Sequence, residues 1–188
     1  VYSCSFCAFS KSTGAKKLRG ASYLLELEEI QNRVREAIRR GATEVCLQGG
    51  IHPKFDGNYY LDVIKAIRKV SPDIHIHAFS PLEIFQGAQT LGLTLEEYLP
   101  ILKEAGLNSL PGTAAEILHD DVRNIICPDK LNAAEWLSVM DAAHSCGLNS
   151  TATIMFGHVE TYDHIAEHLI NIKKVKILKY SMLVAELV

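Results

Sequence analysis

Strand and helix patterns alternate along nearly the whole chain, and this alternation limits the fold more than any single motif does. Apolar residues at helical spacing, such as Leu24, Leu27, Ile30 and Val34, indicate the helices, and short runs of β-branched residues indicate the strands. Glycine or a serine-proline pair ends several of these segments. Helices are predicted at residues 23–40, 59–70, 81–91, 95–105, 114–118, 133–146 and from 162, and strands at 44–48, 73–79, 107–110 and 150–156.

Short links between alternating strands and helices predict an α/β fold, in which parallel strands are joined by right-handed helical crossovers. No linker, repeat or low-complexity tract divides the chain, so residues 1–188 are expected to form a single domain. No G-x-G-x-x-G follows any strand, which disfavours an open dinucleotide-binding sheet. Glycines and polar residues gather behind the strand ends, at 48–50, 111–113 and 157–158. This placement favours a barrel with its active site on that rim.

The composition describes a globular unit with enough apolar material for a sizeable core. Of 188 residues 48% are hydrophobic, and the net charge is only −3. Nothing in this balance indicates nucleic acid as a partner, and no apolar run reaches the ~20 residues that a membrane-spanning helix needs. Five cysteines in unlike settings argue against a secreted disulfide framework. A cytoplasmic protein is therefore expected, although a targeting peptide upstream of Val1 would allow an organelle.

Cys4 and Cys7 form a C-x-x-C pair, whose two thiols can reach one metal centre. A zinc ribbon would need a second such pair, and the other three cysteines stand singly. A thioredoxin-like redox pair would open a helix, whereas residues 8–14 have the composition of a loop. Spacing alone leaves open an iron–sulfur site, a zinc site and an ordinary pair of thiols.

His75 and His77 share one face of their predicted strand, because strand side chains alternate. Ile74 and Ile76 take the other face, which helices would cover, so the imidazoles are expected to point inward. Polar side chains inside a barrel suggest a ligand cavity, but hydrogen-bonded core histidines fit the pattern equally well. A metal-binding role is disfavoured, since no cysteine or carboxylate lies nearby in the sequence to complete a ligand set.

Three further positions have both a structural and a functional interpretation. The pair Gly49-Gly50 allows close backbone approach to a ligand, and it also suits a tight turn. Glu116 is expected in the first turn of helix 114–118, where the helix dipole stabilises an acidic residue. Alternation places Thr153 on one strand face with Thr151, and polar threonines suit an inward surface. An aldolase-like Schiff base is disfavoured, because no lysine occupies an inward strand position.

The run C-S-F-C-A-F-S at residues 4–10 resembles the last part of the radical S-adenosylmethionine (SAM) signature, C-x-x-x-C-x-aromatic-C. In that signature three cysteines hold three irons of a 4Fe-4S cluster. In this register the first cysteine would lie just before Val1, so the chain is expected to be a fragment with two of the three ligands. The resemblance implies a partial (β/α)6 TIM-like radical SAM barrel, truncated at both ends, with the cluster and SAM as cofactors.

A longer match resembles the second component of the deazaflavin (FO) synthases and extends from Val1 to about Lys173. Two sister families, aminofutalosine synthase and dehypoxanthine futalosine cyclase, usually carry P-G-G-G-A-E where residues 111–116 read P-G-T-A-A-E. Residues 174–188 form an atypical tail without the family's sixth-strand segment. The resemblance is carried by residues 47–53, 75–84, 110–118, 127–130 and 154–161.

This resemblance implies a radical SAM transferase that couples the hydroxybenzyl group of L-tyrosine to 5-amino-6-(D-ribitylamino)uracil, in biosynthesis of the coenzyme F420 chromophore. A second radical SAM component, separate or fused, would close the deazaflavin ring, and ferredoxin or flavodoxin would supply the electron. The menaquinone-pathway sister enzymes are the main alternative. The absent third cysteine also leaves open a non-catalytic barrel remnant or a zinc-binding module.

The resemblance also implies roles for individual residues. The family's usual glutamate after the two glycines is replaced here, since His52 and Pro53 follow Gly49-Gly50-Ile51. No general base is assigned. The implied roles are cluster binding for Cys4 and Cys7, adenine packing for Phe6, SAM positioning for Gln48, Gly49, Gly50 and Glu116, adenine flanking for the strand with Thr153, and substrate contact for His75 and His77.

Overall fold

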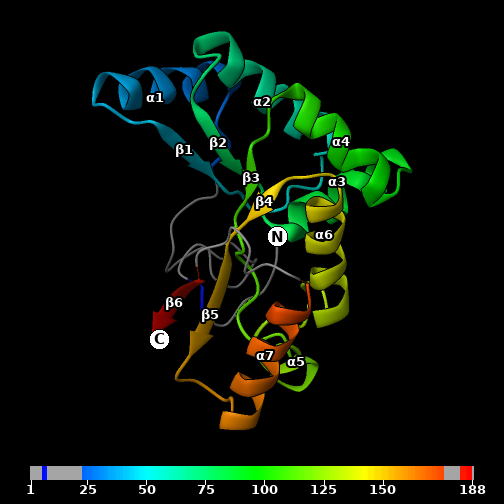
Figure 1. Ribbon diagram of the computed structural model, residues 1–188. Coiled ribbons are helices and arrows are strands. Elements are labelled where there is room, and N and C mark those ends of the chain that lie inside the picture. The colour runs from blue at the N-terminus through cyan, green and yellow to red at the C-terminus, as the bar shows by residue number, and fades with distance from the viewer. Residues whose placement is uncertain (1–5, 8–22, 176–182, 188) are drawn as a thin grey trace.

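The computed structural model describes residues 6–7, 23–175 and 183–187 (Figure 1). Helices and strands alternate through most of the chain, as the sequence pattern predicts. The helices are α1 (Leu27–Arg39), α2 (Gly57–Val70), α3 (Pro81–Leu91), α4 (Leu95–Ala105), α5 (Asp120–Ile126), α6 (Ala133–Ser145) and α7 (Tyr162–Lys174). The strands are β1 (Glu44–Leu47), β2 (His75–Ala78), β3 (Ser109–Leu110), β4 (Asn149–Ser150), β5 (Ala152–Phe156) and β6 (Leu183–Leu187).

The strands pair in parallel, which confirms the predicted α/β class. β1, β2, β3 and β4 lie side by side in chain order, and β5 pairs with β6. Only Thr151 separates β4 from β5, so the strand predicted at 150–156 belongs to two sheets. The Thr151 amide still donates to the Leu110 carbonyl at 3.0 Å, so backbone pairing continues to the point where the chain leaves the first sheet.

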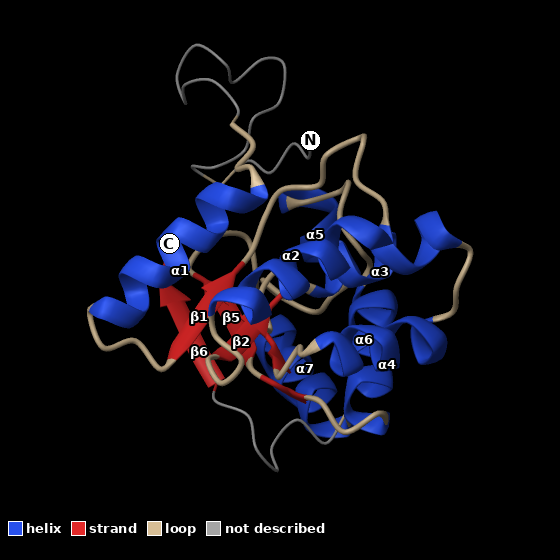
Figure 2. Cartoon of the chain, turned by 90° about the horizontal axis from the view of Figure 1, so that it is seen from above, coloured by secondary structure: helices blue, strands red, loops and turns tan. Residues whose placement is uncertain are grey.

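Helices pack against the outer face of the strands and bury the main core. α3, α4 and α6 lie together on one side of the strands (Figure 2). Ile74 is 5% exposed and Ile76 is fully buried, which confirms that this face of β2 points toward the helices. Tyr98 of α4 and Trp136 of α6 are also fully buried. The opposite face of β2 is left with the two half-buried histidines.

The helix predicted at 114–118 is wrong. Ala114 and Glu116 have left-handed φ angles of 61° and 44°, which a right-handed helix cannot contain. The helix begins instead at Asp120, with His119 as its N-cap. The buried Arg123 side chain explains the difference, because it donates to the carbonyls of Ala114 and Ala115 and holds this segment as a loop. A tertiary contact therefore overrides local helix propensity.

The start of α1 and the C-terminal segment also differ from the sequence prediction, and several other strand and helix ends differ by one or two residues. Residues 23–26 precede α1 without helical structure, although their apolar spacing continues the pattern of the helix. β6 forms at Leu183–Leu187, where no strand was predicted, and it pairs with β5 along Ala152 to Phe156. An edge strand offers free backbone N–H and C=O groups, so a partner strand needs little sequence specificity.

His168 on α7 should make stability depend on pH. Burial, together with the nearby Arg123 charge, lowers its pKa from 6.5 to about 4. Its Nδ1 accepts the Leu118 amide at 3.0 Å, and protonation would break that bond. Since the unfolded chain binds this proton first, we expect stability to fall by about 3 kcal/mol as pH drops from 6.5 to 4. Urea unfolding of wild type and His168→Gln across this range should show a steeper fall of stability in wild type; equal slopes would contradict it.

Candidate functional site

The inner face of β2 carries His75 and His77, and β3 brings Ser109 between them. The Ser109 hydroxyl lies 2.7 Å from His75 Nε2 and 2.7 Å from His77 Nδ1. Glu44 Oε2 of β1 lies 3.7 Å from His75 Nε2. Burial lowers the pKa of His77, against the opposing charge of Glu44, so its neutral form is favoured. One hydroxyl and two imidazoles can donate and accept interchangeably, which suits a hydroxyl-rich ligand.

The loop after β1 contains Gln48, Gly49 and Gly50, the predicted SAM-positioning residues. The Gly49 amide donates to Glu83 Oε1 at 3.0 Å, so the loop is tied to the start of α3. A Cβ at Gly49 would lie 3.3 Å from the same oxygen, whereas a Cβ at Gly50 would meet nothing within 4 Å. Gln48 is exposed, and its Nε2 lies 3.7 Å from the Cys46 sulfur. One glycine therefore makes a close contact, while the other leaves open space beside the backbone.

Glu83 was not predicted as a site residue. It is 3% exposed, and burial raises its pKa to about 7. Its carboxylate also accepts the amide and hydroxyl hydrogens of Ser80 at 2.8 and 2.7 Å, which completes a capping box on α3. The S-x-x-E spacing of Ser80 and Glu83 is a sequence signal for the cap. That spacing carries no information about the contact with Gly49.

Glu116 lies in the loop between β3 and α5, and its carboxylate is only 7% exposed. Lys130 Nζ donates to Oε1 at 2.7 Å, and Arg123 NH1 lies 3.9 Å from Oε2. Oε2 is buried without a hydrogen-bond partner among the residues that the structure describes. The Glu116 carbonyl accepts the Met155 amide of β5 at 3.0 Å. The carboxylate is thus fixed on one side and has an unused acceptor on the other.

Phe6 and Cys7 lie near this carboxylate, although they are far from it in sequence. Both pack against a second apolar cluster formed by residues of α5, β5 and the adjoining loops, including Ile117 and Met155. Lys130 Nζ lies 5.4 Å from the centre of the Phe6 ring, a cation–π distance. The structure therefore brings Phe6, Cys7 and Glu116 into one region. Cys4 lies outside the described residues.

Thr153 is buried beside the loop that leads to Glu116. Its Oγ1 donates to the Gly112 carbonyl at 2.6 Å, and Thr151 Oγ1 accepts the Gly112 amide at 2.8 Å. These two threonines therefore hold the Gly112 backbone beside the start of β5. The Thr153 hydroxyl donates its hydrogen to Gly112. Its role in cofactor binding stays a prediction, in which the residue forms part of the surface beside the cofactor.

The predicted residues lie on or just after the first three strands. The glycine loop follows β1 and Glu116 follows β3, whereas the histidines lie within β2, with His75 at its amino end opposite Glu44 of β1. Parallel strands bring their carboxyl ends to one edge, where barrel enzymes carry their sites. Ser109, Glu83 and Lys130 join this set as residues that the sequence analysis did not assign. All three act on predicted residues through hydrogen bonds.

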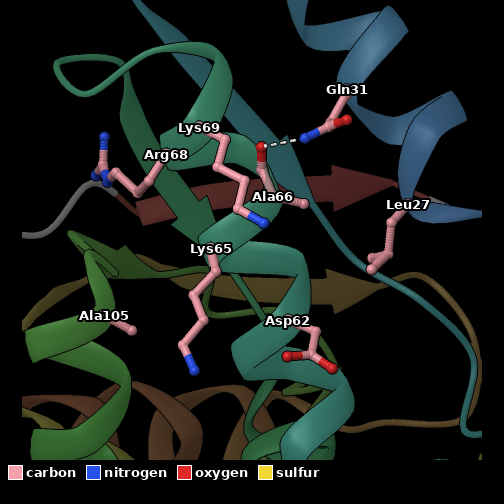
Figure 3. A pocket seen from close by; sticks show the side chains of 8 residues that line it. All are labelled: Leu27, Gln31, Asp62, Lys65, Ala66, Arg68, Lys69 and Ala105. Carbon is pink, nitrogen blue, oxygen red and sulfur yellow. Dashed lines mark hydrogen bonds between the residues drawn. The ribbon is translucent and has the colours of Figure 1, made fainter.

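A hollow lies on the outer helices, among residues of α1, α2 and α4 (Figure 3). It has a volume of about 740 Å³ and is bordered by α1, α2 and the end of α4. Gln31 of α1 closes part of it by donating to the Ala66 carbonyl at 3.0 Å. The Arg68 guanidinium binds the carbonyls of Pro72 and Ile74, so it stabilises the fold there. The hollow contains none of the predicted site residues.

His119, Asp121 and His164 form another group whose ligand atoms lie within 4.8 Å of one another. Each imidazole already accepts a backbone amide through Nδ1: His119 from Asp121 at 3.3 Å, and His164 from Thr161 at 3.1 Å. His119 Nε2 also lies 3.4 Å from Glu167 Oε2, so helix capping and a surface ion pair account for the contacts of this group. Separately, no helix in the described part of the chain is long and apolar enough to cross a bilayer.

Comparison with known proteins identifies a matching family and similar curated sequences. Residues 1–170 match the profile of the Radical SAM superfamily. The chain is 48% identical over 173 residues to the 5-amino-6-(D-ribitylamino)uracil–L-tyrosine 4-hydroxyphenyl transferase of Methanothermobacter thermautotrophicus, covering 92% of this chain and 46% of the relative. It is 48% identical over 179 residues to the enzyme of that name from Methanocaldococcus jannaschii, covering 94% and 49%. The chain therefore spans about half the length of these curated relatives.

Two solved structures share the fold. Methylornithine synthase superposes with a TM-score of 0.71 at 16% identity, covering 100% of this chain and 50% of that one. Streptococcus suis SuiB, bound to the precursor peptide SuiA, gives a TM-score of 0.64 at 14% identity, covering 98% and 36%. At these identities the similarity supports the partial barrel architecture alone.

Proposed function

The chain belongs to the radical SAM superfamily, and on this premise we propose that it carries the core of a transferase joining the hydroxybenzyl part of L-tyrosine to 5-amino-6-(D-ribitylamino)uracil. The observation that carries this proposal is the 48% identity, over nearly the whole chain, to relatives named for that transfer. A third relative of that name, from Microcystis aeruginosa, is 47% identical over 176 residues. Identity at this level favours a shared reaction over the menaquinone-pathway alternative.

The buried carboxylate of Glu116 supports SAM as the cofactor. Its Oε2 atom has no hydrogen-bond partner among the described residues, and a buried acceptor without a donor is costly. A ribose hydroxyl would supply that donor, while Lys130 keeps Oε1 occupied and the carboxylate oriented. Phe6 and Met155 would provide the apolar surface for adenine. These residues fit a nucleoside with a free diol.

Cys4 and Cys7 are proposed to hold a 4Fe-4S cluster, with the Gly49-Gly50 loop binding the amino group of SAM. Together the cluster and SAM supply the radical chemistry of this superfamily. Thr153 contributes to the cofactor wall through its fixed position rather than its hydroxyl, which is bonded to Gly112. The chain's own task is to orient both molecules and to exclude water and stray hydrogen donors.

His75 and His77 are proposed to contact the substrates. Ser109 links the two rings, and the three groups offer both donors and acceptors on the inner face of β2. The ribityl hydroxyls and the tyrosine ammonium and carboxylate need such mixed partners. The neutral state that burial favours for His77 keeps an imidazole acceptor available.

His77→Ala should remove coupled product while leaving the cluster and uncoupled SAM cleavage intact. The reason is that His77 is proposed to touch substrate and not SAM. Product and 5′-deoxyadenosine are measured by mass spectrometry, and product is expected to fall about 100-fold, or ~2.7 kcal/mol. His164→Ala, the same change in the first turn of α7, where the imidazole takes part in the helix cap, is the control. Unchanged product formation in the His77 variant would remove this residue from the site.

Reconstitution of the full-length protein tests the whole proposal. Iron and sulfide are added anaerobically, followed by reductant, SAM, tyrosine and the ribityl-diaminouracil. Formation of 5′-deoxyadenosine together with the tyrosine–uracil adduct is the expected result. 5′-Deoxyadenosine without the adduct would keep the superfamily but exclude this transfer, and zinc without acid-labile sulfide would favour a zinc module.

We also propose that residues 1–188 act as one domain beside a further part of the protein. The continuous apolar cluster that joins α1 to α7 supports a single unit. A second radical SAM component that closes the deazaflavin ring and a ferredoxin- or flavodoxin-like reductant are the expected partners. The reductant would supply the electron for SAM cleavage and the second component would use the coupled product, both in the cytoplasm.

A further inference from the structure

Glu83 is a buried carboxylate that the proposed function has not yet used. Its Oε2 atom binds the amide and hydroxyl of Ser80, and its Oε1 atom binds the Gly49 amide at 3.0 Å. One side chain thus joins the first turn of α3 to the glycine loop after β1. Glu83 and Gly49 are 34 residues apart in sequence, so this contact is part of the tertiary structure.

A helix cap alone does not account for the burial of Glu83. In the capping boxes of α4 and α6 the carboxylates of Glu97 and Glu135 accept only the N-cap amide, and Glu97 is exposed while Glu135 is only partly buried. Burying a carboxylate carries a desolvation cost, which is reflected in the pKa of about 7 at Glu83. Glu83 differs from these two residues by two further hydrogen bonds, one from the Ser80 hydroxyl and one from the Gly49 amide, and only the second reaches outside the cap.

Helix α3, which carries Glu83, is held in place by contacts with α2 and α4. The Gly57 amide at the start of α2 donates to Thr90 Oγ1 of α3 at 2.9 Å, and Tyr98 of α4 donates to the Gly57 carbonyl at 2.7 Å. A Cβ at Gly57 would lie 2.5 Å from the Gly87 carbonyl oxygen, so α2 and α3 are in backbone contact. Since the loop ends where α2 begins, Glu83 is held at a fixed place beside it.

The bond to Glu83 also determines which way the loop's carbonyl points. In a trans peptide the N–H of one residue and the C=O of the residue before it point in opposite directions, and the structure describes no cis peptide bond. Because the Gly49 amide points to Glu83, the Gln48 carbonyl points to the opposite side of the loop. Donation to a carboxylate polarises this peptide and strengthens its carbonyl as an acceptor.

We propose that Glu83 is a positioning residue for SAM, which holds the Gly49 peptide so that the Gln48 carbonyl is presented to the ligand's ammonium group. This inference rests on the proposed function only for the identity of the ligand. A cation needs acceptors that are already oriented, and a loop with two adjacent glycines would otherwise lose much conformational freedom on binding. Glu83 removes that cost before SAM arrives.

The test compares four variants of the full-length reconstituted protein by isothermal titration with SAM. Glu83→Ala should raise the Kd about tenfold, or ~1.4 kcal/mol. Glu83→Gln retains a carbonyl acceptor for Gly49 and should stay within about threefold of wild type. Ser80→Ala removes the cap but leaves the Gly49 acceptor, and Glu97→Ala removes the equivalent cap on α4; both should bind SAM as wild type does.

Amide hydrogen exchange in the cluster-free protein gives a second measurement that requires no activity. The Gly49 amide should exchange faster in Glu83→Ala than in wild type, and Glu83→Gln should restore its protection. Where Glu83→Ala fails to fold, Glu83→Asp replaces it, because the shorter side chain withdraws from Gly49 while the charge is kept. It should give the same loss of SAM affinity.

Three results would overturn the inference. One is unchanged SAM affinity in a Glu83→Ala protein whose Gly49 amide exchanges quickly. Another is an equal loss of affinity in Ser80→Ala, which would assign the effect to the cap of α3. The third is a wild-type protein that does not bind SAM, which would also end the proposed function. SAM binding with this pattern of variants but without transferase product would reject the transferase and keep the role of Glu83.

Discussion

Cys7→Ser is expected to abolish cluster binding, and with it all product formation. A serine hydroxyl is a harder and less acidic ligand than a thiolate, so it cannot replace sulfur on iron. Cys7 is half-buried against the apolar cluster beside Glu116, where a bound cluster would be shielded from water. Iron and acid-labile sulfide per protein should fall to near zero, and turnover should fall by at least ~10³-fold, or ~4 kcal/mol.

Cys146→Ser is the matched control for this experiment. Cys146 is the C-cap of α6, and its thiol donates to the Ala143 carbonyl at 3.2 Å. Burial raises the pKa of this thiol, so it is a poor source of thiolate. The control should retain iron, sulfide and product formation. If Cys7→Ser bound as much iron and sulfide as wild type, Cys7 would not be a cluster ligand.

Gly112→Ala is expected to destabilise the fold by about 3 kcal/mol or more. An added Cβ would lie 2.1 Å from the Thr151 carbonyl oxygen and 2.5 Å from the Ala152 Cα, and neither backbone atom can rotate away. Relief of this overlap requires separating the Gly112 loop from β5, which would break the bonds to Thr151 and Thr153. Overpacking of this kind costs roughly 1–3 kcal/mol where side chains can adjust, and more where they cannot.

Urea unfolding measures this loss, with Gly50→Ala as the control for stability alone. A Cβ at Gly50 would meet nothing within 4 Å, so its unfolding midpoint should shift little. Because the Gly112 loop leads to Glu116, the Gly112 variant should also lose SAM affinity at urea-free conditions. A midpoint equal to that of wild type would mean that the loop and β5 are not in the contact described.

The helices at 81–91 and 95–105 show what local sequence can predict. Each begins with a capping box and is followed by a glycine in the left-handed conformation, Gly92 and Gly106. These signals act within a few residues, so pattern reading finds both ends. The segment 114–118 has apolar helix formers too, but Arg123 and the left-handed Ala114 and Glu116 decide its shape. No pattern in the sequence of this segment predicts the Arg123 contacts or the left-handed residues.

The site divides in the same way. The C-x-x-C spacing, the paired glycines and the alternation of His75 and His77 are local patterns, and they predict residues of the candidate site. Lys130 binds Glu116 across 14 residues, and Glu83 binds Gly49 across 34. Such partners depend on how loops meet in space. A capping box predicts where Glu83 lies on α3, but only tertiary structure reveals which backbone amide it holds.

Strand order equal to chain order has a consequence for how this protein is made. Each of β2, β3 and β4 pairs with the strand that precedes it in the chain, so no strand must wait for a distant partner. On the ribosome, the sheet can therefore grow by one strand and its covering helix at a time, with only its last edge exposed. We expect nascent chains in which residues 1–150 have emerged from the ribosome to resist protease already, before the segment that pairs with β5 has emerged.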